Sequence, residues 1–312
     1  MSRIYTISDV HVDYLENRKY IEHLSDQKYE SDVLLLAGDV TDNLSLLKTT
    51  LQTLKKKFKD VFYVPGNHEL WLKKDDREMR FKDSIEKFHA IIKLCHDTGV
   101  KTEPEKVTST QGDVWVVPLF AWYSTPYDDP QDSLYAGDSA DVHQDSENMW
   151  MDNHLCLWTS LKDKTRSQYF ADLNKEPISL VMKNKSPGDV VVSFSHFLSR
   201  KELLGHTEAE FEEFNKERSL RKLPEFQIDK SKSKQMQFDF SLFAGCKVLE
   251  EAIRMLGSVV HVHGHQHRNR DREIGGVRYV SHCLGYPREQ QNGFTWGLME
   301  WDGPKQIWPS TK

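Results

Sequence analysis

The sequence has no excess of basic residues, no long apolar run and few cysteines, and each absence argues against a class of protein. Its 42 lysines and arginines are outnumbered by 48 aspartates and glutamates, which gives a formal net charge of −6 and no basic field for a long nucleic acid. No apolar run is long enough to span a bilayer. The four cysteines, Cys95, Cys156, Cys246 and Cys283, show no CxxC spacing, so they indicate neither a zinc finger nor a disulfide framework.

The N-terminus also lacks the apolar stretch of a signal peptide, because residues 1–3 lead directly into a strand-like run at residues 4–7. With cysteines that are expected to be reduced, this predicts a cytoplasmic protein with no membrane partner. The 312 residues, of which 38% are hydrophobic and 29% charged, are typical of a soluble globular protein with a sizeable core. Length alone allows one large α/β domain or two smaller ones.

Apolar runs alternate with helical patterns in the first part of the chain. Strands are predicted at residues 4–7, 32–37 and 61–64, with helices at residues 16–26 and from residue 44 onward. This alternation indicates a parallel sheet with helices on its faces. In such sheets the functional loops follow the carboxyl ends of the strands.

The later part of the chain has the same elements, interrupted by two insertions. We expect helices at 80–96 and 248–256, and strands at 106–110, 114–119, 189–194 and 259–263. Strand-like runs at 278–282, 294–301 and 306–308 suggest a second sheet. An acidic, aromatic stretch at about 120–182 and a lysine-rich stretch at about 205–245 are interpreted as insertions in a single domain of residues 1–312.

Polar residues follow five of the predicted strands, and they are the types that bind metal ions. They are Asp9, His11, Asp39, Asn67, His68, His196, His265 and His267. Taken singly, Asp9 and Asn67 are also common turn residues, His196 could be a core histidine, and the last two could belong to a His-rich surface patch. Together, the carboxylate, imidazole and amide groups suit Mn, Fe, Zn or Co better than Mg or Ca. Even the seven that remain when His68 is set aside are too many ligands for one catalytic ion, whereas two divalent ions about 3.5–4 Å apart that share a carboxylate account for them.

The spacing of these residues resembles the calcineurin-like metallophosphoesterases. The family's five blocks occur in order as Asp9-x-His11, Gly38-Asp39, Gly66-Asn67-His68-Glu69, His196 and Gly264-His265-x-His267. The resemblance covers the scaffold but neither insertion. It implies an α/β metallophosphoesterase fold, a β-sandwich flanked by α-helices in a four-layer α/β/β/α arrangement.

The resemblance also implies roles for these residues. Asp9, His11 and His267 would hold one metal ion, Asn67, His196 and His265 the other, and Asp39 would bridge the two. His68 would lie beside the ions without binding them and would assist the departure of the leaving oxygen.

These residue types fit the hydrolysis of a phosphoric ester. A hydroxide that bridges two cations can attack the phosphorus in line, and no covalent nucleophile is required. The expected partner is therefore a small phosphodiester or phosphomonoester, with nucleotide-like compounds as one option, and the sequence leaves the oligomeric state open. The alternative is a non-catalytic binding scaffold of the same fold, as in the family's retromer subunit, for which substituted ligands would be expected.

Five further residues are candidates for contacts with the ligands or the substrate: Asp42, Glu69, His263, Arg268 and His282. Each also has an ordinary explanation, as a loop acid, a helix-start residue, a strand position or a surface arginine. Asp42 stands where purple acid phosphatases have a tyrosine, and Asp42-Asn43 replaces the arginine of the serine/threonine phosphatases, so neither of those subfamilies is indicated.

The tryptophans of the first insertion have two alternative explanations. They form a lid over the site, or they form the insertion's own core.

Overall fold

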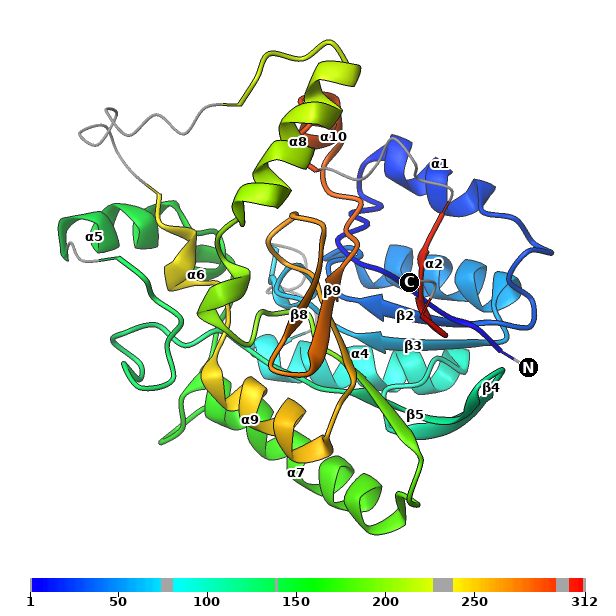
Figure 1. Cartoon of the computed structure of the whole chain (residues 1–312). Helices are drawn as coiled ribbons and strands as arrows, with labels where there is room; N and C mark the ends of the chain where they lie inside the picture. The colour runs from blue at the N-terminus through cyan, green and yellow to red at the C-terminus, as the bar shows by residue number, and fades with distance from the viewer. Residues whose placement is uncertain (1, 74–80, 138–139, 227–237, 296–302, 311–312) are drawn as a thin grey trace.

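The computed structural model describes residues 2–73, 81–137, 140–226, 238–295 and 303–310 (Figure 1). A first sheet of four strands has the order β10-β1-β2-β3. Strands β1 (Ile4–Ile7), β2 (Val33–Ala37) and β3 (Asp60–Val64) are parallel, and β10 (Lys305–Trp308) pairs with β1 in the antiparallel sense. Helix α1 (Leu15–His23) joins β1 to β2, and α2 (Leu44–Lys57) joins β2 to β3. Asn43 caps α2 by accepting a hydrogen bond from the backbone N–H of Leu46.

A second sheet of six strands has the order β4-β5-β6-β7-β9-β8. Its members are β4 (Glu105–Ser109), β5 (Gly112–Pro118), β6 (Val190–Phe194), β7 (Val260–His263), β9 (Val277–Ser281) and β8 (Arg270–Ile274). Strands β5, β6, β7 and β9 are parallel, and the two edge strands β4 and β8 are antiparallel to their neighbours.

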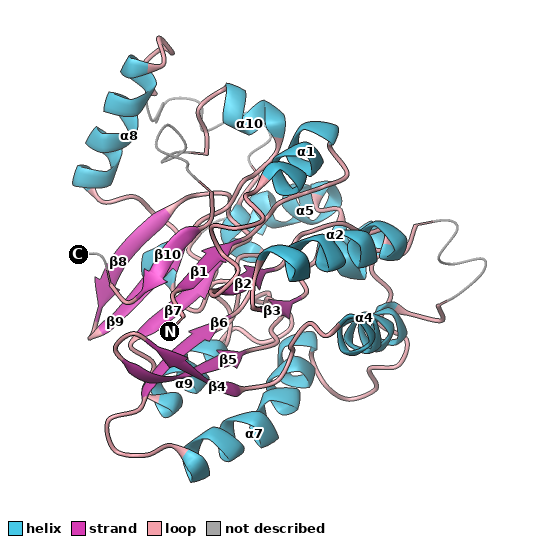
Figure 2. Ribbon diagram, turned by 90° about the vertical axis from the view of Figure 1, so that its right-hand side faces the viewer, coloured by secondary structure: helices cyan, strands magenta, loops and turns pink. Residues whose placement is uncertain are grey.

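The two sheets pack face to face, and helices cover their outer faces (Figure 2). Between the sheets, Val33 and Leu35 of β2 belong to the same buried cluster as Val192 of β6 and Val260 of β7. Helices α2 and α4 (Ser84–Thr98) cover the first sheet, and α7 (Arg166–Asn184) and α9 (Lys247–Leu256) cover the second. This is the predicted four-layer α/β/β/α fold. All of β2 is buried, because a central strand between two layers needs apolar side chains on both faces.

The C-terminal strands are arranged differently from the prediction, which placed all three in the second sheet. Only β9 is there, whereas β10 lies at the edge of the first sheet, beside β1. Of the run predicted at 294–301, residues 294 and 295 are not in a strand and 296–302 lie outside the described residues. The sequence reading missed β8, whose charged residues Arg270 to Glu273 give no apolar signal. The Gly275-Gly276 turn that joins β8 to β9, with both φ angles positive, is the signal that could have revealed it.

The connections that contain the two insertions add further helices. Between β5 and β6 the structure has α5 (Ala140–Met149), α6 (Asp152–Leu155) and the covering helix α7, and between β6 and β7 it has α8 (Glu208–Leu220) before α9. Short 3-10 turns lie at His68–Leu70, Lys201–Leu203 and Phe240–Leu242, and α10 (Pro287–Gln291) follows β9. Across the described ranges, none of the helices combines the length and the apolar character needed to span a bilayer.

Candidate metal centre

The loops after β1, β2, β3, β6 and β7 meet at one edge of the sandwich and bring the predicted ligands together. All seven are at most 7% exposed: Asp9, His11, Asp39, Asn67, His196, His265 and His267. The parallel strands of both sheets end at this edge, which is why residues more than 250 positions apart become neighbours.

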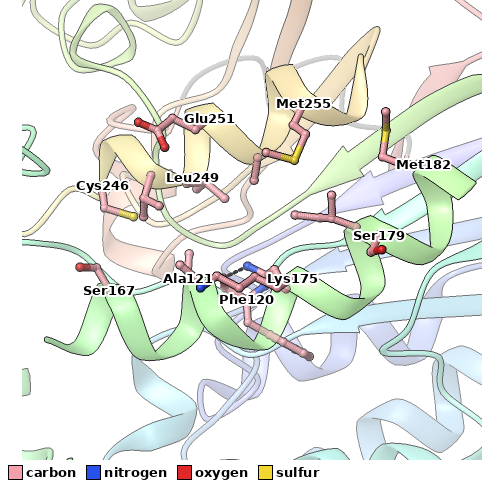
Figure 3. Close-up of a pocket in the computed structure, with 15 residues that line it drawn as sticks. Phe120, Ala121, Ser167, Lys175, Ser179, Met182, Cys246, Leu249, Glu251 and Met255 are labelled. Atoms are coloured by element: carbon pink, nitrogen blue, oxygen red, sulfur yellow. Dashed lines mark hydrogen bonds between the residues drawn. The ribbon is translucent and has the colours of Figure 1, made fainter. Parts of the chain in front are cut away.

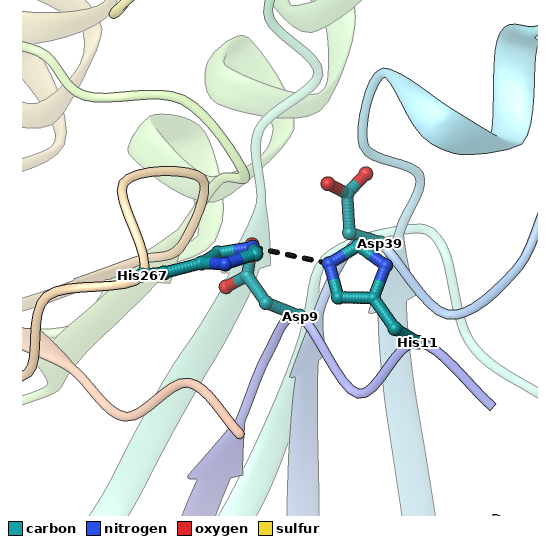
Figure 4. A group of neighbouring side chains, drawn as sticks. All are labelled: Asp9, His11, Asp39 and His267. Carbon is teal, nitrogen blue, oxygen red and sulfur yellow. Dashed lines mark hydrogen bonds and ion pairs between the residues drawn. The ribbon is translucent and has the colours of Figure 1, made fainter. Parts of the chain in front are cut away.

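The ligand atoms form two groups that share Asp39. Within each group the atoms lie within 4.8 Å of one another, and the groups are Asp9, His11, Asp39 and His267, and Asp39, His196 and His265. Figure 4 shows the first group, with the imidazoles of His11 and His267 turned toward each other beside the two carboxylates. Asn67 adjoins the second group, since its Oδ1 lies 3.2 Å from Nε2 of His196.

The spacing of the histidine nitrogens fits shared metal ions. Nε2 of His11 lies 3.0 Å from Nε2 of His267, and Nε2 of His196 lies 3.2 Å from Nδ1 of His265. Two nitrogens bound to one ion at ~2.1 Å each, roughly at right angles, are about 3 Å apart. Two unprotonated nitrogens at that distance would repel each other, and a cation between them removes the repulsion.

The second nitrogen of two of these rings is held by a backbone carbonyl. Nδ1 of His196 lies 2.9 Å from the carbonyl oxygen of Ala37, and Nε2 of His265 lies 2.9 Å from that of Phe243. A carbonyl only accepts, so each ring donates its N–H there and keeps the lone pair of its other nitrogen for the site.

The electrostatics of the site also fit cations. Burial by itself raises the pKa of Asp9, but His267, whose Nε2 lies 3.3 Å from Oδ1 of Asp9, holds that pKa at about 2. Against the effect of burial, the charge of Asp9 in turn raises the pKa of His267 to about 10. His196 and Asp39 are paired in the same way, with the pKa of Asp39 well below its ordinary value and that of His196 raised to about 9. Buried carboxylates that stay ionised need positive charge beside them. The imidazolium groups of His267 and His196 supply it here, and metal cations bound by the neutral imidazoles would supply it in their place.

Five of the seven residues have a backbone conformation that non-glycine residues rarely adopt. In the part of the chain that the structure describes, six such residues have a positive φ angle, and five of them are Asp9 (50°), His11 (38°), Asp39 (54°), His265 (72°) and His267 (53°). Left-handed backbone is costly for such residues and persists only where the surroundings enforce it, as they often do at functional sites.

Glycines beside the ligands allow the loops to approach one another closely. A Cβ atom on Gly38 would lie 2.5 Å from Nδ1 of His196, and one on Gly264 would lie 2.6 Å from Oδ2 of Asp9. Both distances are far too short for non-bonded contacts. These two positions of the family pattern therefore need glycine for packing, and Gly38 needs it also for its positive φ angle of 82°.

Glu69 connects two of the ligand loops. Its carboxylate accepts hydrogen bonds from the backbone N–H groups of Asp39, Val40 and Thr41 after β2, and from that of Gly66 after β3. Burial and the neighbouring charge of Asp39 raise the pKa of Glu69 to about 7. Glu69 therefore positions the loops and does not face the cavity.

His68 lies beside the ligand groups without belonging to either. Its backbone N–H donates to Oδ1 of Asp39 at 3.0 Å, and its ring packs against Trp71 with the ring centres 3.7 Å apart. The hydroxyl of Tyr286 lies 3.3 Å from Nε2 of His68. The imidazole lines the cavity above the ligands.

Asp152 of the first insertion orients Asn67. Its Oδ1 accepts hydrogen bonds from Nδ2 of Asn67 at 2.8 Å and Nε1 of Trp71 at 2.6 Å, and its Oδ2 accepts one from Nε1 of Trp150 at 2.9 Å. Because the amide nitrogen of Asn67 is occupied in this way, its oxygen faces the second ligand group. The buried carboxylate thus links a ligand, the ring beside His68 and a wall of the cavity.

Above the ligands lies a cavity of about 390 Å³. Asp39, Asn67, His265 and His267 line it together with His68. The other lining residues come from both insertions (Met149, Trp150, Met151, Asp152, Phe238 and Phe240) and from outside them (Trp71, Gln266, Tyr286 and Glu289). Among the described residues that line it there is no lysine or arginine. Positive charge for a bound phosphate would therefore come from metal ions and histidines.

None of the five additional candidates lines this cavity. The carboxylate of Asp42 pairs with Nζ of Lys73 at 2.5 Å, and Arg268 donates to two backbone carbonyls. His263 and His282 are buried, which lowers their pKa values to about 4 and about 3. The fifth, Glu69, acts on the ligand loops as described above.

The sequence reading missed Asp152, Glu289 and Tyr286. The position of Glu289 could have been predicted in part. A proline followed two residues later by an acid, as in Pro287-Arg288-Glu289, is typical of the first turn of a helix. Asp152 had none, because it is one acid in an acidic stretch. The tryptophans of the first insertion divide between the two alternatives, since Trp122 is 1% exposed and packs in the core whereas Trp150 lines the cavity.

Glu289 fixes the orientation of His267. Its Oε2 lies 2.5 Å from Nδ1 of His267 and accepts a hydrogen bond from the backbone N–H of Tyr286 at 2.9 Å. The ring therefore donates through Nδ1 and directs Nε2 toward Asp9 and His11. A carboxylate that holds a metal-binding histidine in this way also makes it a stronger ligand.

We expect Glu289→Gln to weaken metal binding by about 10- to 100-fold, because the amide accepts a weaker hydrogen bond and removes a negative charge. The loss of affinity is measured by calorimetric titration of the metal-free protein with Mn²⁺ or Zn²⁺, as the dissociation constant of the weaker-bound ion. Glu251→Gln on the exposed face of α9 is the matched control and should leave it unchanged. Equal affinities in the two variants would show that Glu289 does not support a ligand.

Three comparisons bear on this arrangement. A family model described as calcineurin-like phosphoesterase matches residues 2–269. The curated acyl-carrier-protein phosphodiesterase PptH of Mycobacterium tuberculosis (strain ATCC 25618 / H37Rv) is 32% identical over 123 residues, which are 38% of this chain and 37% of that protein. The match therefore spans little more than a third of that relative. The crystal structure of Phosphopantetheinyl Hydrolase (PptH) from Mycobacterium tuberculosis superposes with a TM-score of 0.71 over 99% of this chain and 97% of that chain, at 22% identity, which shows a shared fold.

Proposed function

Since the chain belongs to the calcineurin-like phosphoesterase family, we propose that it hydrolyses a phosphodiester with two divalent metal ions. The observation that carries the proposal is the pair of ligand groups that share Asp39. Every ligand position of the family pattern holds a metal-binding residue, which argues against the alternative of a non-catalytic scaffold.

The assignment of the ligands follows the two groups. Asp9, His11 and His267 would hold one ion, Asn67, His196 and His265 would hold the other, and Asp39 would be shared by both. Mixed nitrogen and oxygen donors favour Mn, Fe, Zn or Co. When bound, such a pair of ions activates a water molecule and offsets the charge that builds on the phosphoryl oxygens.

His68 supplies the proton that the leaving oxygen needs. Histidine exchanges protons near neutral pH, and this one projects into the cavity while its backbone is tied to the bridging carboxylate of Asp39. Packing against Trp71 limits the rotation of the ring. The imidazole is thereby held beside the ligand groups without belonging to either.

The cavity favours a diester over a monoester. A monoester carries one more negative charge, which phosphatases commonly meet with arginine, and the described residues of the cavity wall include no arginine or lysine. A diester also has a second ester group that needs space, and the cavity extends beyond the ligands along side chains of the insertions.

The likeness to PptH suggests a more specific candidate. That relative is named an acyl-carrier-protein phosphodiesterase and a phosphopantetheinyl hydrolase. By analogy, the substrate would be a phosphopantetheinyl diester borne on a carrier protein, in place of the small free phosphoester that the sequence suggested. The 32% identity over 123 residues is the observation that favours it.

Metal content and turnover test the proposal together. We expect protein loaded with Mn²⁺ or Zn²⁺ to bind two ions per chain and to hydrolyse bis-p-nitrophenyl phosphate with kcat/KM at least about tenfold above that for p-nitrophenyl phosphate, the equivalent of one charge-assisted hydrogen bond. A chelator should reduce turnover to background, and either metal should restore it. The specific candidate, a phosphopantetheinyl diester on a carrier protein, is tested by incubating the metal-loaded protein with a holo-carrier protein. Loss of the phosphopantetheine group is then measured from the intact mass of the carrier protein. Fully loaded protein without any turnover would favour the scaffold alternative.

A further inference from the structure

Large apolar side chains gather beside the candidate metal centre while remaining open to solvent. Met149 and Met151 are each 46% exposed and Phe238 is 38% exposed, and all three line the same cavity, together with Trp150 and Phe240. We call these five residues the apolar wall. Single exposed apolar residues are ordinary on a protein surface, but a group of them that continues into a cavity marks a binding surface.

The apolar wall is held rigidly although two insertions contribute to it. The indole of Trp150 stacks on Phe243 with the ring centres 4.7 Å apart and the planes 5° apart, and Phe238 stacks on the other two rings. Nε1 of Trp150 donates to Oδ2 of Asp152 at 2.9 Å and lies 3.1 Å from the hydroxyl of Tyr123. The aromatic surface is therefore formed before any ligand arrives, and the two methionines at its edge can adapt to the ligand's shape.

The charged groups that border the apolar wall are already engaged. Both oxygens of Asp152 accept hydrogen bonds, from Asn67, Trp71 and Trp150. Glu289 accepts from His267 and from a backbone N–H. A charged group of a ligand placed here would lose its hydration and gain no ion pair from these residues.

We propose that the apolar wall binds an uncharged, apolar chain or ring of one of the two alcohols of the phosphodiester substrate. The inference rests on the proposed function, because the cavity that holds the wall is continuous with the metal centre. The metal ions would fix the phosphate, and the wall would select the alcohol by burying apolar surface and excluding charge.

A series of alkylphosphonates tests this without any chemical step. Methyl-, butyl- and hexylphosphonate share a head group that the metal ions bind and that the protein cannot hydrolyse. We expect the dissociation constant of the metal-loaded protein, measured by calorimetry, to fall about twofold per added methylene, roughly half the full effect of burial because one side of the wall is open. The fall from methyl to hexyl is then about 30-fold, and a terminal amine or carboxylate on the hexyl chain should abolish it.

Paired methionine variants supply the control. The double variant Met149→Ser/Met151→Ser should reduce the change in the logarithm of the dissociation constant per added methylene to less than half of its wild-type value. The affinity for methylphosphonate should stay unchanged. Met182→Ser/Met255→Ser, on an apolar groove between α7 and α9 away from the metal centre (Figure 3), should change neither, although those methionines are 44% and 61% exposed. All four residues are exposed, so folding should survive.

The outcomes separate this inference from the proposed function. A wild-type dissociation constant independent of chain length would overturn the inference even if diesters are hydrolysed. An equal dependence on chain length in both double variants would overturn it as well. Failure of methylphosphonate itself to bind, with no diester turnover, would instead count against the metal centre and the proposed function.

Discussion

Asp39→Asn is expected to lower kcat/KM for bis-p-nitrophenyl phosphate on the order of 10³-fold or more, and to reduce the metal content below two ions per chain. The magnitude corresponds to the loss of one member of a buried charge cluster. Asp39 is the residue common to both ligand groups, and its charge faces His196 and His68 at 3.5 Å and 3.8 Å. Asparagine removes that charge and directs an N–H₂ group toward one cation.

The matched control for this variant is Asp42→Asn, three positions along the same loop. Asp42 is 8% exposed and pairs with the half-exposed Lys73. It belongs to neither ligand group and lines no part of the cavity, so activity should stay within about twofold, although the protein is expected to lose some stability. Metal analysis, steady-state kinetics and far-UV circular dichroism on both variants separate lost function from lost fold. A folded Asp39→Asn protein with two ions and nearly full activity would show that the two sites do not share this carboxylate.

His68→Gln should reduce kcat by about 10²- to 10⁴-fold, the usual contribution of a general acid, while both metal ions remain bound. The two effects separate because His68 lies outside both ligand groups but inside the cavity. Glutamine keeps a polar side chain of similar reach but cannot donate a proton as an acid. The loss should grow as the leaving alcohol becomes more basic, because a poor leaving group depends more on protonation.

Two diesters that differ only in the leaving group measure this dependence. Methyl p-nitrophenyl phosphate has a good leaving group and methyl phenyl phosphate a poorer one, so the ratio of wild-type to variant kcat should be larger for the second. His96→Gln, with a side chain that is 91% exposed on α4, is the control and should leave both rates unchanged. The same loss for both substrates, or a loss of metal, would mean that His68 acts by holding the site together.

Most of the scaffold could be predicted from the sequence, because its apolar runs have the length and position of buried strands. Val33 to Ala37 is apolar throughout and lies between two layers, whereas β8 is charged, lies at an edge and escaped the sequence reading. The assignment of β10 to the first sheet could not be read from residues 305–308, because a short strand carries no sign of which distant strand will pair with it. Its neighbour β1 is about 300 residues away.

The sequence by itself determined which residues could bind metal: short acidic, amide and imidazole motifs placed directly after buried strands. What is local is that residues such as Asp39 and His265 follow the carboxyl ends of their strands. Once those strands are parallel, the residues must lie at one edge of the sandwich. Only the tertiary structure decided what surrounds them. Asp152, Glu289 and the apolar wall come from loops and insertions whose positions depend on packing over long sequence distances, and a lone acid or methionine in such a segment looks the same whether it faces solvent or the metal centre.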